Sequence, residues 1–328
     1  MPLSIQCPEP GVDLAPWAAA NREGIAAWLL AHRALLFRGF ELGTAERFQA
    51  FVRTIAAGPL LEYKDRSTPR YEVADGVYVS TIYPANQRIH PHNEGTYWTT
   101  WPLKIAFCCL QPASSGGETP IVDVRQVYRR LDAAVRDTFR EKQVMYVRNY
   151  NPGVGLPWQE VFQTSDRGIV AAYAAANGIT VEWTVGGRLR TRQVRPAVRR
   201  HPLTHEPVWF NHVAFFHVTS LDPIVREALL GSYGEDGLPF NTYFGDGLPI
   251  PPDVVAQIRE AYAAEQQSFP WQRDDVLLLD NMSMAHAREP YVGERRVIVA
   301  MAEATSDTVA AGAATTASSY RDISGARS

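Results

Sequence analysis

Apolar residues recur with helical spacing near the start of the chain, on either side of one mostly apolar run. Ile25 and Leu29 fall on one face of a predicted helix over 20–32, because positions four apart share a helix face. Residues 34–40 are dominated by apolar side chains and predict a buried strand, and residues 44–57 carry a second amphipathic helical pattern. The chain is therefore predicted to begin with two helices that flank a buried strand.

Short apolar runs between turn residues predict strands along much of the remaining chain. Residues 148–217 are rich in glycine, proline and aromatic side chains, with short alternating runs at 180–185 and 208–216. That segment is predicted to form hairpins and long loops in a β-rich core. Further strands are predicted at 77–82, 101–110, 119–122, 276–279 and 295–301.

Three later helices have recognisable start signals. Asp123 is a predicted N-cap, and proline in the first turn predicts helices over 223–234 and 252–263. The helix after Asp123 has an apolar face made of Val124, Val127, Tyr128, Leu131 and Val135.

The pattern of many strands with few helices predicts one β-sandwich or barrel-like domain wrapped by helices. The chain contains no internal repeat and no convincing linker, so we expect a single domain over 1–304. Residues 305–328 are rich in alanine, threonine, serine and glycine and lack apolar periodicity. A disordered C-terminal tail is predicted there.

Composition excludes several classes of protein. Of the 328 residues 46% are hydrophobic and 20% are charged, and the formal net charge is -3. These values are typical of a globular protein and provide no basic field for nucleic acid. The chain has no run of 18 consecutive apolar residues, so no membrane span is predicted. One segment, 188–200, holds six arginines; it is interpreted as a solvated hairpin, with docking of an acidic partner as the alternative.

Cysteine usage favours a reducing compartment. The chain has three cysteines, and Cys108 and Cys109 are adjacent within an apolar run. Buried thiols are predicted there. The chain has no C-x-x-C pair, so no zinc site is predicted from its cysteines. The first residues lack a basic segment followed by an apolar one, so no signal peptide is predicted. A cytoplasmic location is expected.

Two distant fragments carry candidate metal chemistry. His92 and Glu94 are two residues apart, and in an extended segment such side chains point the same way. His286 follows the predicted buried strand at 276–279 and can supply a second imidazole. Two imidazoles and one carboxylate form the facial triad of non-haem Fe(II) oxygenases. His90 competes as a partner of His92, but that pair lacks an anionic ligand.

Two other features fit the same kind of site. The turn Gly116-Gly117-Glu118-Thr119 ends in a hydroxyl, although such a turn can also be a plain hairpin. Arg295 and Arg296 open the predicted final strand, where a guanidinium can clamp a carboxylate through two hydrogen bonds. Asn281 or Asn211 is a candidate for holding an imidazole in one tautomer.

Taken in order, these fragments resemble the TauD/TfdA family of Fe(II)- and 2-oxoglutarate-dependent oxygenases. The resemblance spans about residues 30–303 and is greatest to the branch of syringomycin-type amino-acid hydroxylases, which carries H-x-E. Two departures from the family are Ala287, where H-G-R is common, and Asp274, where a Gly-Asp turn is usual. The fragments are Leu36-Phe37-Arg38-Gly39-Phe40, His92-Asn93-Glu94, Gly116-Gly117-Glu118-Thr119, Trp209-Phe210-Asn211, Asp280-Asn281, His286-Ala287-Arg288 and Arg295.

The resemblance implies a double-stranded β-helix, or jelly-roll, core and a complete set of site residues. Iron would be held by His92, Glu94 and His286, and Thr119 with an arginine would bind the distal carboxylate of 2-oxoglutarate. The G-x-R spacing of the similar branch selects Arg295, and alignment to the taurine enzymes selects Arg296. Strand alternation lets only one of them face inward, and Arg295 is favoured. Arg88, His90 and Arg288 are candidate substrate residues.

The implied reaction consumes O2 and 2-oxoglutarate and hydroxylates an unactivated C–H bond. The implied substrate is an amino acid, free or tethered to a carrier protein in secondary metabolism. A carboxylate at Glu94 favours hydroxylation over halogenation, because related halogenases have a small residue there. Desaturation, epoxidation or ring formation on the same metal core are alternatives. A jelly-roll binding protein with a vestigial site is a further one, although all five candidate residues retain competent side chains.

Overall fold

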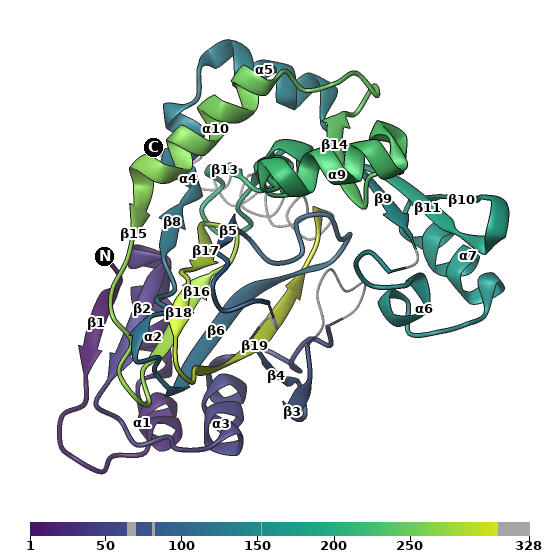
Figure 1. Cartoon of the computed structure of the whole chain (residues 1–328). Coiled ribbons are helices and arrows are strands. Elements are labelled where there is room, and N and C mark those ends of the chain that lie inside the picture. The colour runs from purple at the N-terminus through teal and green to yellow at the C-terminus, as the bar shows by residue number, and fades with distance from the viewer. Residues whose placement is uncertain (64–69, 81–82, 152, 308–328) are drawn as a thin grey trace, which may run out of the picture.

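A seven-stranded sheet forms the larger layer of the protein and joins segments from both ends of the chain (Figure 1). In order across the sheet the strands are β1 (Leu3–Gln6), β2 (Ala34–Arg38), β16 (Val276–Asp280), β6 (Trp101–Gln111), β19 (Arg296–Thr305), β4 (Val77–Val79) and β3 (Glu72–Ala74). The computed structural model describes residues 1–63, 70–80, 83–151 and 153–307. Strand β6 pairs antiparallel with β16 on one side and β19 on the other. The C-terminal strands therefore complete a sheet that the N-terminal strands begin.

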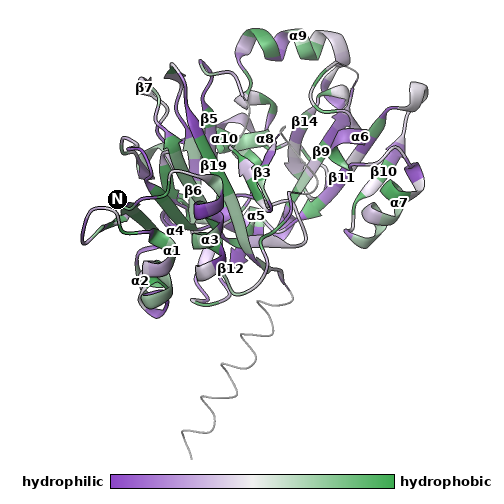
Figure 2. Cartoon of the chain, turned by 90° about the horizontal axis from the view of Figure 1, so that it is seen from below, coloured by the Kyte–Doolittle hydropathy of each residue, from purple (hydrophilic) through white to green (hydrophobic). Residues whose placement is uncertain are grey.

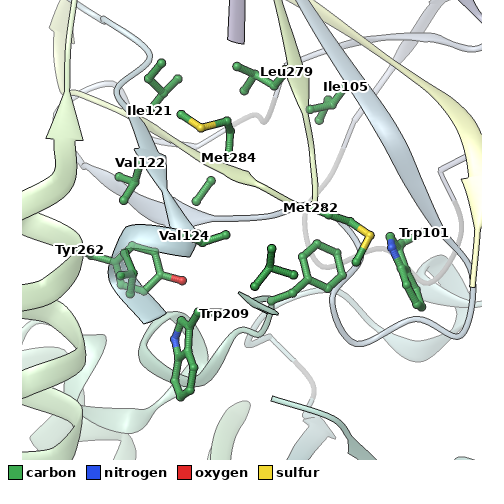
Figure 3. Packing of buried hydrophobic residues seen from close by; sticks show 14 of the residues in the cluster. Trp101, Ile105, Ile121, Val122, Val124, Trp209, Tyr262, Leu279, Met282 and Met284 are labelled. Carbon is green, nitrogen blue, oxygen red and sulfur yellow. The ribbon is translucent and has the colours of Figure 1, made fainter. Parts of the chain in front are cut away.

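A four-stranded antiparallel sheet forms the second layer. Its strands in order are β15 (Gln266–Gln267), β8 (Ile121–Asp123), β17 (Met284–Arg288) and β5 (Ile89–His92). Ile121, Val122 and Met284 of this sheet share one buried cluster with Ile105 and Leu279 of the larger sheet (Figure 3). Two sheets packed through one apolar cluster form the jelly-roll arrangement. The prediction of a mainly β fold with flanking helices is confirmed.

Both faces of strand β2 are buried, which explains why its residues are almost all apolar. Ala34 and Leu36 belong to the cluster between the two sheets, whereas Leu35 and Phe37 belong to a cluster on the outer face. Successive side chains of a strand point to opposite faces, so both faces of β2 are buried. The outer cluster is covered by α1 (Leu14–Ala20), α2 (Arg22–His32) and α3 (Ala45–Ile55). The helices predicted at 20–32 and 44–57 are thereby confirmed.

A third sheet extends the molecule on one side. Its strands in order are β10 (Thr180–Trp183), β11 (Leu189–Arg195), β9 (Val144–Tyr150) and β14 (Phe240–Phe244), and the helices α6 (Trp158–Val161) and α7 (Arg167–Ala176) lie beside it (Figure 1). Strands β9 to β11 confirm the hairpins predicted for the middle of the chain. The same prediction missed α7, because its apolar contacts with this sheet decide its fold and local composition does not.

The run at 208–216 was predicted as a single strand and is divided in the structure. It begins as β13 (Pro207–Trp209) and ends as α8 (Val213–Phe216). The side-chain oxygen of Asn211 accepts a hydrogen bond from the Val213 N–H at 3.0 Å. Asparagine in that position satisfies a free N–H at a helix start. The turn at Asn211 therefore ends the strand and allows α8 to form.

The remaining elements agree with the predicted start signals. Asp123 and Asp222 accept backbone N–H groups at the starts of α4 and α9, and α10 begins at a proline. These elements are α4 (Val124–Arg130), α5 (Ala133–Lys142), α9 (Pro223–Tyr233), α10 (Pro252–Glu265), β7 (Ser115–Gly116), β12 (Val198–Arg200), β18 (Tyr291–Val292), η1 (Val185–Gly187), η2 (Val218–Ser220) and η3 (Glu235–Gly237).

Two predicted segments reach the limits of the described residues. The strand predicted at 77–82 is β4, which ends at Val79, and residues 81–82 lie outside the described part. Strand β19 continues through Thr305, the first residue of the predicted tail, and residues 308–328 also lie outside the described part.

Figure 2 shows hydrophobic residues along β6 and β19. Within the described residues, no helix combines the length and hydrophobicity needed to cross a membrane.

Candidate metal centre

Pairing of β5 with β17 brings His92 and His286 together. The two residues are direct partners in the antiparallel register, and their ring centroids lie 4.5 Å apart. Glu94 follows shortly after β5, and one ligand atom from each of the three side chains lies within 4.8 Å of the others. Glu94 and His286 are each only 5% exposed. The two imidazoles and one carboxylate singled out in the sequence thus converge at one point, with the donor set of a facial triad.

Asn281 fixes the backbone that carries Glu94. Its side-chain oxygen accepts the Glu94 N–H at 2.8 Å, and its amide donates to the Glu94 carbonyl at 2.9 Å. The Asn93 amide in turn donates to the Asn281 carbonyl at 2.7 Å. These bonds join the segment after β5 to the turn before β17. The prediction that Asn281 or Asn211 holds an imidazole is wrong, because the Asn211 side chain bonds the Ala197 carbonyl and the Val213 N–H, and Asn281 holds Glu94.

Both imidazoles are prepared to act as neutral ligands. The Nδ1 atom of His92 is hydrogen-bonded to the His90 carbonyl at 2.9 Å, which leaves Nε2 for a metal. Burial lowers the pKa of His92, and burial followed by the charge of His92 lowers the pKa of His286 well below its usual value. Within the described part of the chain the buried Nδ1 of His286 has no hydrogen-bond partner. Neutral imidazoles beside a carboxylate suit a divalent cation such as Fe(II).

Arg70 forms a buried ion pair with Glu94. One guanidinium nitrogen lies 2.8 Å from Glu94 Oε2, and the two side chains are 4% and 6% exposed. Burial is the largest influence and works to lower the pKa of Arg70, but Glu94 together with Tyr63 and Tyr97 raises that pKa above its usual value. The pair engages one carboxylate oxygen and leaves the other for a ligand bond. Sequence inspection missed Arg70, because an isolated arginine outside any periodic element gives no local signal.

Thr119 and Arg295 meet in a small cavity beside the triad, which His92 and His286 also line. The Arg295 guanidinium donates to the Gly117 carbonyl at 2.8 Å and to Thr119 Oγ1 at 3.3 Å. Gly117 has φ +76°, and a Cβ there would lie 2.9 Å from Arg295 Cδ. The glycine turn is therefore shaped to admit this arginine. Burial, and then the neighbouring Arg288, lower the pKa of Arg295 to about 10, so its charge remains at neutral pH.

In the structure, the positions of the two side chains relative to the cavity distinguish Arg295 from Arg296. Arg295 precedes β19 and lines the cavity beside the triad, whereas Arg296 is exposed and does not line it. A carboxylate in the cavity would therefore meet Arg295. This placement supports Arg295 as the predicted 2-oxoglutarate residue.

The sequence matches the family described as "Taurine catabolism dioxygenase TauD, TfdA family" over residues 2–302. The chain belongs to the TauD/TfdA family. The resemblance found in the sequence is confirmed, and the protein is an Fe(II)- and 2-oxoglutarate-dependent oxygenase. The dapdiamide synthesis protein DdaC of Enterobacter agglomerans is 44% identical over 268 residues, covering 82% of this chain and 81% of DdaC.

Solved structures share the fold at low sequence identity. AAD-2 in complex with Mn(II) and N-oxalylglycine has a TM-score of 0.56 at 13% identity, covering 93% of this chain and 95% of AAD-2. PvcB from Pseudomonas aeruginosa has a TM-score of 0.54 at 16% identity, covering 91% of this chain and 84% of PvcB. These likenesses show that the jelly-roll core of this TauD/TfdA protein is that of known oxygenases.

The three candidate substrate residues of this TauD/TfdA protein have different surroundings. Arg88 pairs with Glu289 at 2.8 Å, and His90 is exposed on β5. Arg288 lines the cavity, but its guanidinium donates to the carbonyls of Tyr83, Pro84 and Gln87. These bonds are 2.9, 2.6 and 2.6 Å long. Two of the three charges are thus engaged by the protein itself, and the substrate role of all three remains a prediction.

One departure from the family pattern has a visible structural consequence. Asp274 has φ 66°, a left-handed conformation that favours glycine, and glycine is the residue usual there in the family. Its carboxylate accepts the Gly43 N–H at 3.0 Å. Asp275 next to it holds Arg38 through two hydrogen bonds of 2.9 and 2.7 Å. The turn before β16 is therefore preserved by side-chain contacts at a residue that lacks the freedom of glycine.

Proposed function

We propose that this enzyme hydroxylates an unactivated C–H bond of an amino acid in secondary metabolism, with His92, Glu94 and His286 as its iron ligands. The convergence of these three residues beside the cavity of Thr119 and Arg295 carries the proposal. Related halogenases have a small residue where this chain has Glu94. A complete carboxylate at that position favours oxygen transfer over halogenation.

The side chains divide the work of the site. His92, Glu94 and His286 would hold Fe(II), and Arg295 with Thr119 would bind the distal carboxylate of 2-oxoglutarate. When bound, the metal and its cosubstrate supply the oxidising power of O2 for attack on an unactivated C–H bond. Arg295 uses only some of its five N–H donors on Gly117 and Thr119 and keeps others for a carboxylate.

Aromatic rings shield the two imidazoles. The ring centroids of Phe107 and His286 lie 4.8 Å apart, and those of Phe215 and His92 lie 4.7 Å apart. These apolar walls exclude water from the ligands and limit reactions that do not involve the substrate. The remaining work of the protein is to place one C–H bond of the substrate next to the metal.

The substrate class rests on the similarity to DdaC. That relative is a dapdiamide synthesis protein, and the two chains match over more than four fifths of each. An amino-acid-like small molecule is therefore the proposed substrate, either free or presented as an aminoacyl group on a carrier protein. Mass spectrometry of products from a panel of free and carrier-bound amino acids distinguishes these forms: an added oxygen atom supports hydroxylation, and a loss of two hydrogens would show desaturation or ring closure.

Assembly of the site is tested without knowledge of the substrate. Anaerobic addition of Fe(II) and then 2-oxoglutarate to the metal-free protein is expected to give a weak visible charge-transfer band. The band should appear only when both additions are made. Absence of a band with a fully folded protein would refute the assignment and favour a vestigial site.

We further infer that residues 1–304 fold as one domain and that the protein works in the cytoplasm. The two sheets share one buried cluster, which supports a single folding unit. All three cysteines are free, with Cys108 and Cys109 buried, and free thiols suit a reducing compartment. Deletion of the residues after Thr305 should leave the charge-transfer band intact, and fractionation of the source cells should recover the enzyme with cytoplasmic markers.

A further inference from the structure

The Thr119 hydroxyl accepts hydrogen bonds from two nitrogen donors at the edge of the cavity beside the triad. The indole Nε1 of Trp271 donates to Thr119 Oγ1 at 3.1 Å, and Nη2 of Arg295 donates to the same oxygen at 3.3 Å. Thr119 and Trp271 are both buried. Thr119 and Arg295 line the cavity together with His92 and His286, whereas Trp271 does not line it. Trp271 therefore acts on the cavity through the hydroxyl of Thr119.

The two bonds determine what the Thr119 hydroxyl can still do. A hydroxyl has one O–H donor and two lone pairs that accept. The nitrogens of an indole and of a guanidinium only donate, so the two bonds occupy both lone pairs of Thr119 Oγ1. Within the described residues, no acceptor is bonded to the hydroxyl proton. The hydroxyl is thus left as a donor for a ligand in the cavity.

Strand pairing brings Trp271 to Thr119. Strands β15 and β8 pair antiparallel, with Gln267 opposite Ile121 (Figure 1). In an antiparallel pair, the residues after one strand lie beside the residues before the other. The segment that follows β15 therefore runs past Thr119. There the Trp271 ring also packs edge-on against Phe269, with ring centroids 5.6 Å apart.

One ion pair holds the backbone on both sides of Trp271. Arg38 and Asp275 are joined at 2.7 Å, and Asp275 is fully buried. Arg38 also donates to the Pro270 carbonyl at 3.0 Å, and Asp275 accepts the Gln272 N–H at 2.8 Å. Trp271 lies between these two anchored residues. Its indole is therefore held in place before a ligand arrives, which lowers the cost of ordering the site on binding.

We propose that Trp271 is a positioning residue for the cosubstrate. Together with Arg295 it occupies the accepting side of the Thr119 hydroxyl and keeps the O–H for the distal carboxylate of 2-oxoglutarate. An ionised carboxylate only accepts hydrogen bonds, so it matches a hydroxyl held as a donor beside a guanidinium. A group that also donates, such as an amide, would leave an N–H unmatched there. This inference rests on the proposed function, because it takes Thr119 and Arg295 as the residues that bind 2-oxoglutarate.

The test measures the affinity of the anaerobic Fe(II) enzyme for 2-oxoglutarate by titration of the charge-transfer band. Trp271→Phe removes the N–H and keeps an aromatic ring. It is expected to raise the Kd about threefold to tenfold, the effect of losing one neutral hydrogen bond. Thr119→Val removes the hydroxyl itself and should raise the Kd at least as much. Both variants should bind Fe(II) like the wild type in equilibrium dialysis, because neither residue is a proposed iron ligand.

The double variant Trp271→Phe/Thr119→Val separates orientation of the hydroxyl from packing of the ring. Once the hydroxyl is absent, Trp271 has no group to orient, so its replacement should change the Kd less than about twofold. A tryptophan that acts only by packing would weaken binding by the same factor whether or not the hydroxyl is present. Equal factors in the two backgrounds therefore overturn the inference, as does wild-type affinity in Trp271→Phe.

Trp209→Phe is the matched control. Trp209 is buried in the same apolar cluster as Trp271 (Figure 3). Within the described residues its Nε1 has no hydrogen-bond partner, and its side chain does not line the cavity. This variant should keep the wild-type Kd for 2-oxoglutarate. A rise equal to that of Trp271→Phe would show that loss of any buried indole weakens the site, and it would overturn the inference.

Two provisions keep the outcome interpretable. If Trp271→Phe does not fold, as judged by its melting curve, 3-benzothienylalanine at position 271 keeps the shape of the indole and replaces only its N–H by sulfur. It should raise the Kd by the same factor, and wild-type affinity would overturn the inference. Absence of the band in the wild type refutes the proposed function, and wild-type affinity in Thr119→Val refutes the cosubstrate role of Thr119. Weak binding by Thr119→Val with normal binding by Trp271→Phe refutes this inference alone.

Discussion

The proposed cosubstrate side of the candidate metal centre and the side opposite it are built from different kinds of structure. On the cosubstrate side, Thr119 precedes β8 and Arg295 precedes β19, and a glycine turn and a hydrogen bond to Thr119 Oγ1 fix the guanidinium. On the other side, helices α8 and α10 carry Phe215 and Arg259, and Arg259 is held by one carbonyl. A residue anchored to sheets has little freedom, whereas helices and loops outside the sheets can vary. Under the proposed assignment, the enzyme would hold its cosubstrate rigidly and leave recognition of its own substrate to more independent elements.

The largest expected effect comes from removal of an imidazole that both sides share. His92→Ala or His286→Ala should abolish the charge-transfer band and 2-oxoglutarate consumption, because two remaining ligands hold Fe(II) too weakly. Equilibrium dialysis with Fe(II) measures the loss directly. His32→Ala, an exposed histidine at the end of α2, is the control and should bind one Fe(II). Tight binding of one Fe(II) by either ligand variant contradicts the triad.

Arg70→Gln should have the second-largest effect, because it leaves the buried carboxylate of Glu94 without a counter-charge. Loss of one partner of a buried pair costs about 3–5 kcal/mol, so the metal-free protein should melt at a markedly lower temperature. Bound Fe(II) would restore a positive charge beside Glu94. The rise in melting temperature on anaerobic metal addition should therefore be larger in Arg70→Gln than in the wild type.

The double variant Arg70→Gln/Glu94→Gln separates charge from packing. Both charges are then gone, and much of the stability of the metal-free protein should return. An equally low melting temperature in the single and double variants would show that Arg70 contributes through packing against Tyr63 instead.

Replacement of the proposed cosubstrate arginine, Arg295, tests the rigid side. Arg295→Gln should raise the KM for 2-oxoglutarate by about 10–100-fold, the equivalent of ~1.4–2.8 kcal/mol lost from charged hydrogen bonds. Arg296→Gln, one residue along the chain, should change it little because that side chain is exposed. Steady-state assay of succinate formation measures both. The reverse ranking would move the cosubstrate site to Arg296.

The smallest effect is expected from Gly117→Ala. A methyl group there would lie 2.9 Å from Arg295 Cδ in a left-handed backbone, so we expect a cost of about 1–2 kcal/mol and a several-fold rise in KM for 2-oxoglutarate. Gly11→Ala provides the control, because it also has positive φ but nothing within 4 Å. It should lower the melting temperature without changing KM. Equal KM values in both variants would show that Gly117 does not shape the arginine site.

Local signals predicted the fold where neighbouring residues alone decide it. The cap at Asp123 and the prolines in the first turns of α9 and α10 marked helix starts correctly, because each signal acts only on residues next to it in the chain. The helix α7 and the turn at Asn211 were missed. Their stability depends on a partner sheet and on a side-chain bond within a run that alternates like a strand.

The residues of the site also divide into those that the sequence could identify and those that it could not. His92, Glu94 and His286 could be selected from their chemistry and from the alternation of an extended segment, and the family match added Thr119 and Arg295. Arg70 could not be selected, since nothing in the sequence distinguishes it from the other arginines. Arg88 and Arg288 were equally plausible candidates, and the structure shows their guanidinium groups bonded to Glu289 and to loop carbonyls.

The sequence by itself determined which donor atoms the protein has and on which faces of its strands they lie, because both follow from residue type and a period of two. Only the tertiary structure decided which charges are compensated. The free energy of a buried charge depends on the groups that replace its water, and those groups come from distant parts of the chain. Arg70 meets Glu94 for that reason, whereas Arg288 meets the carbonyls of Tyr83, Pro84 and Gln87.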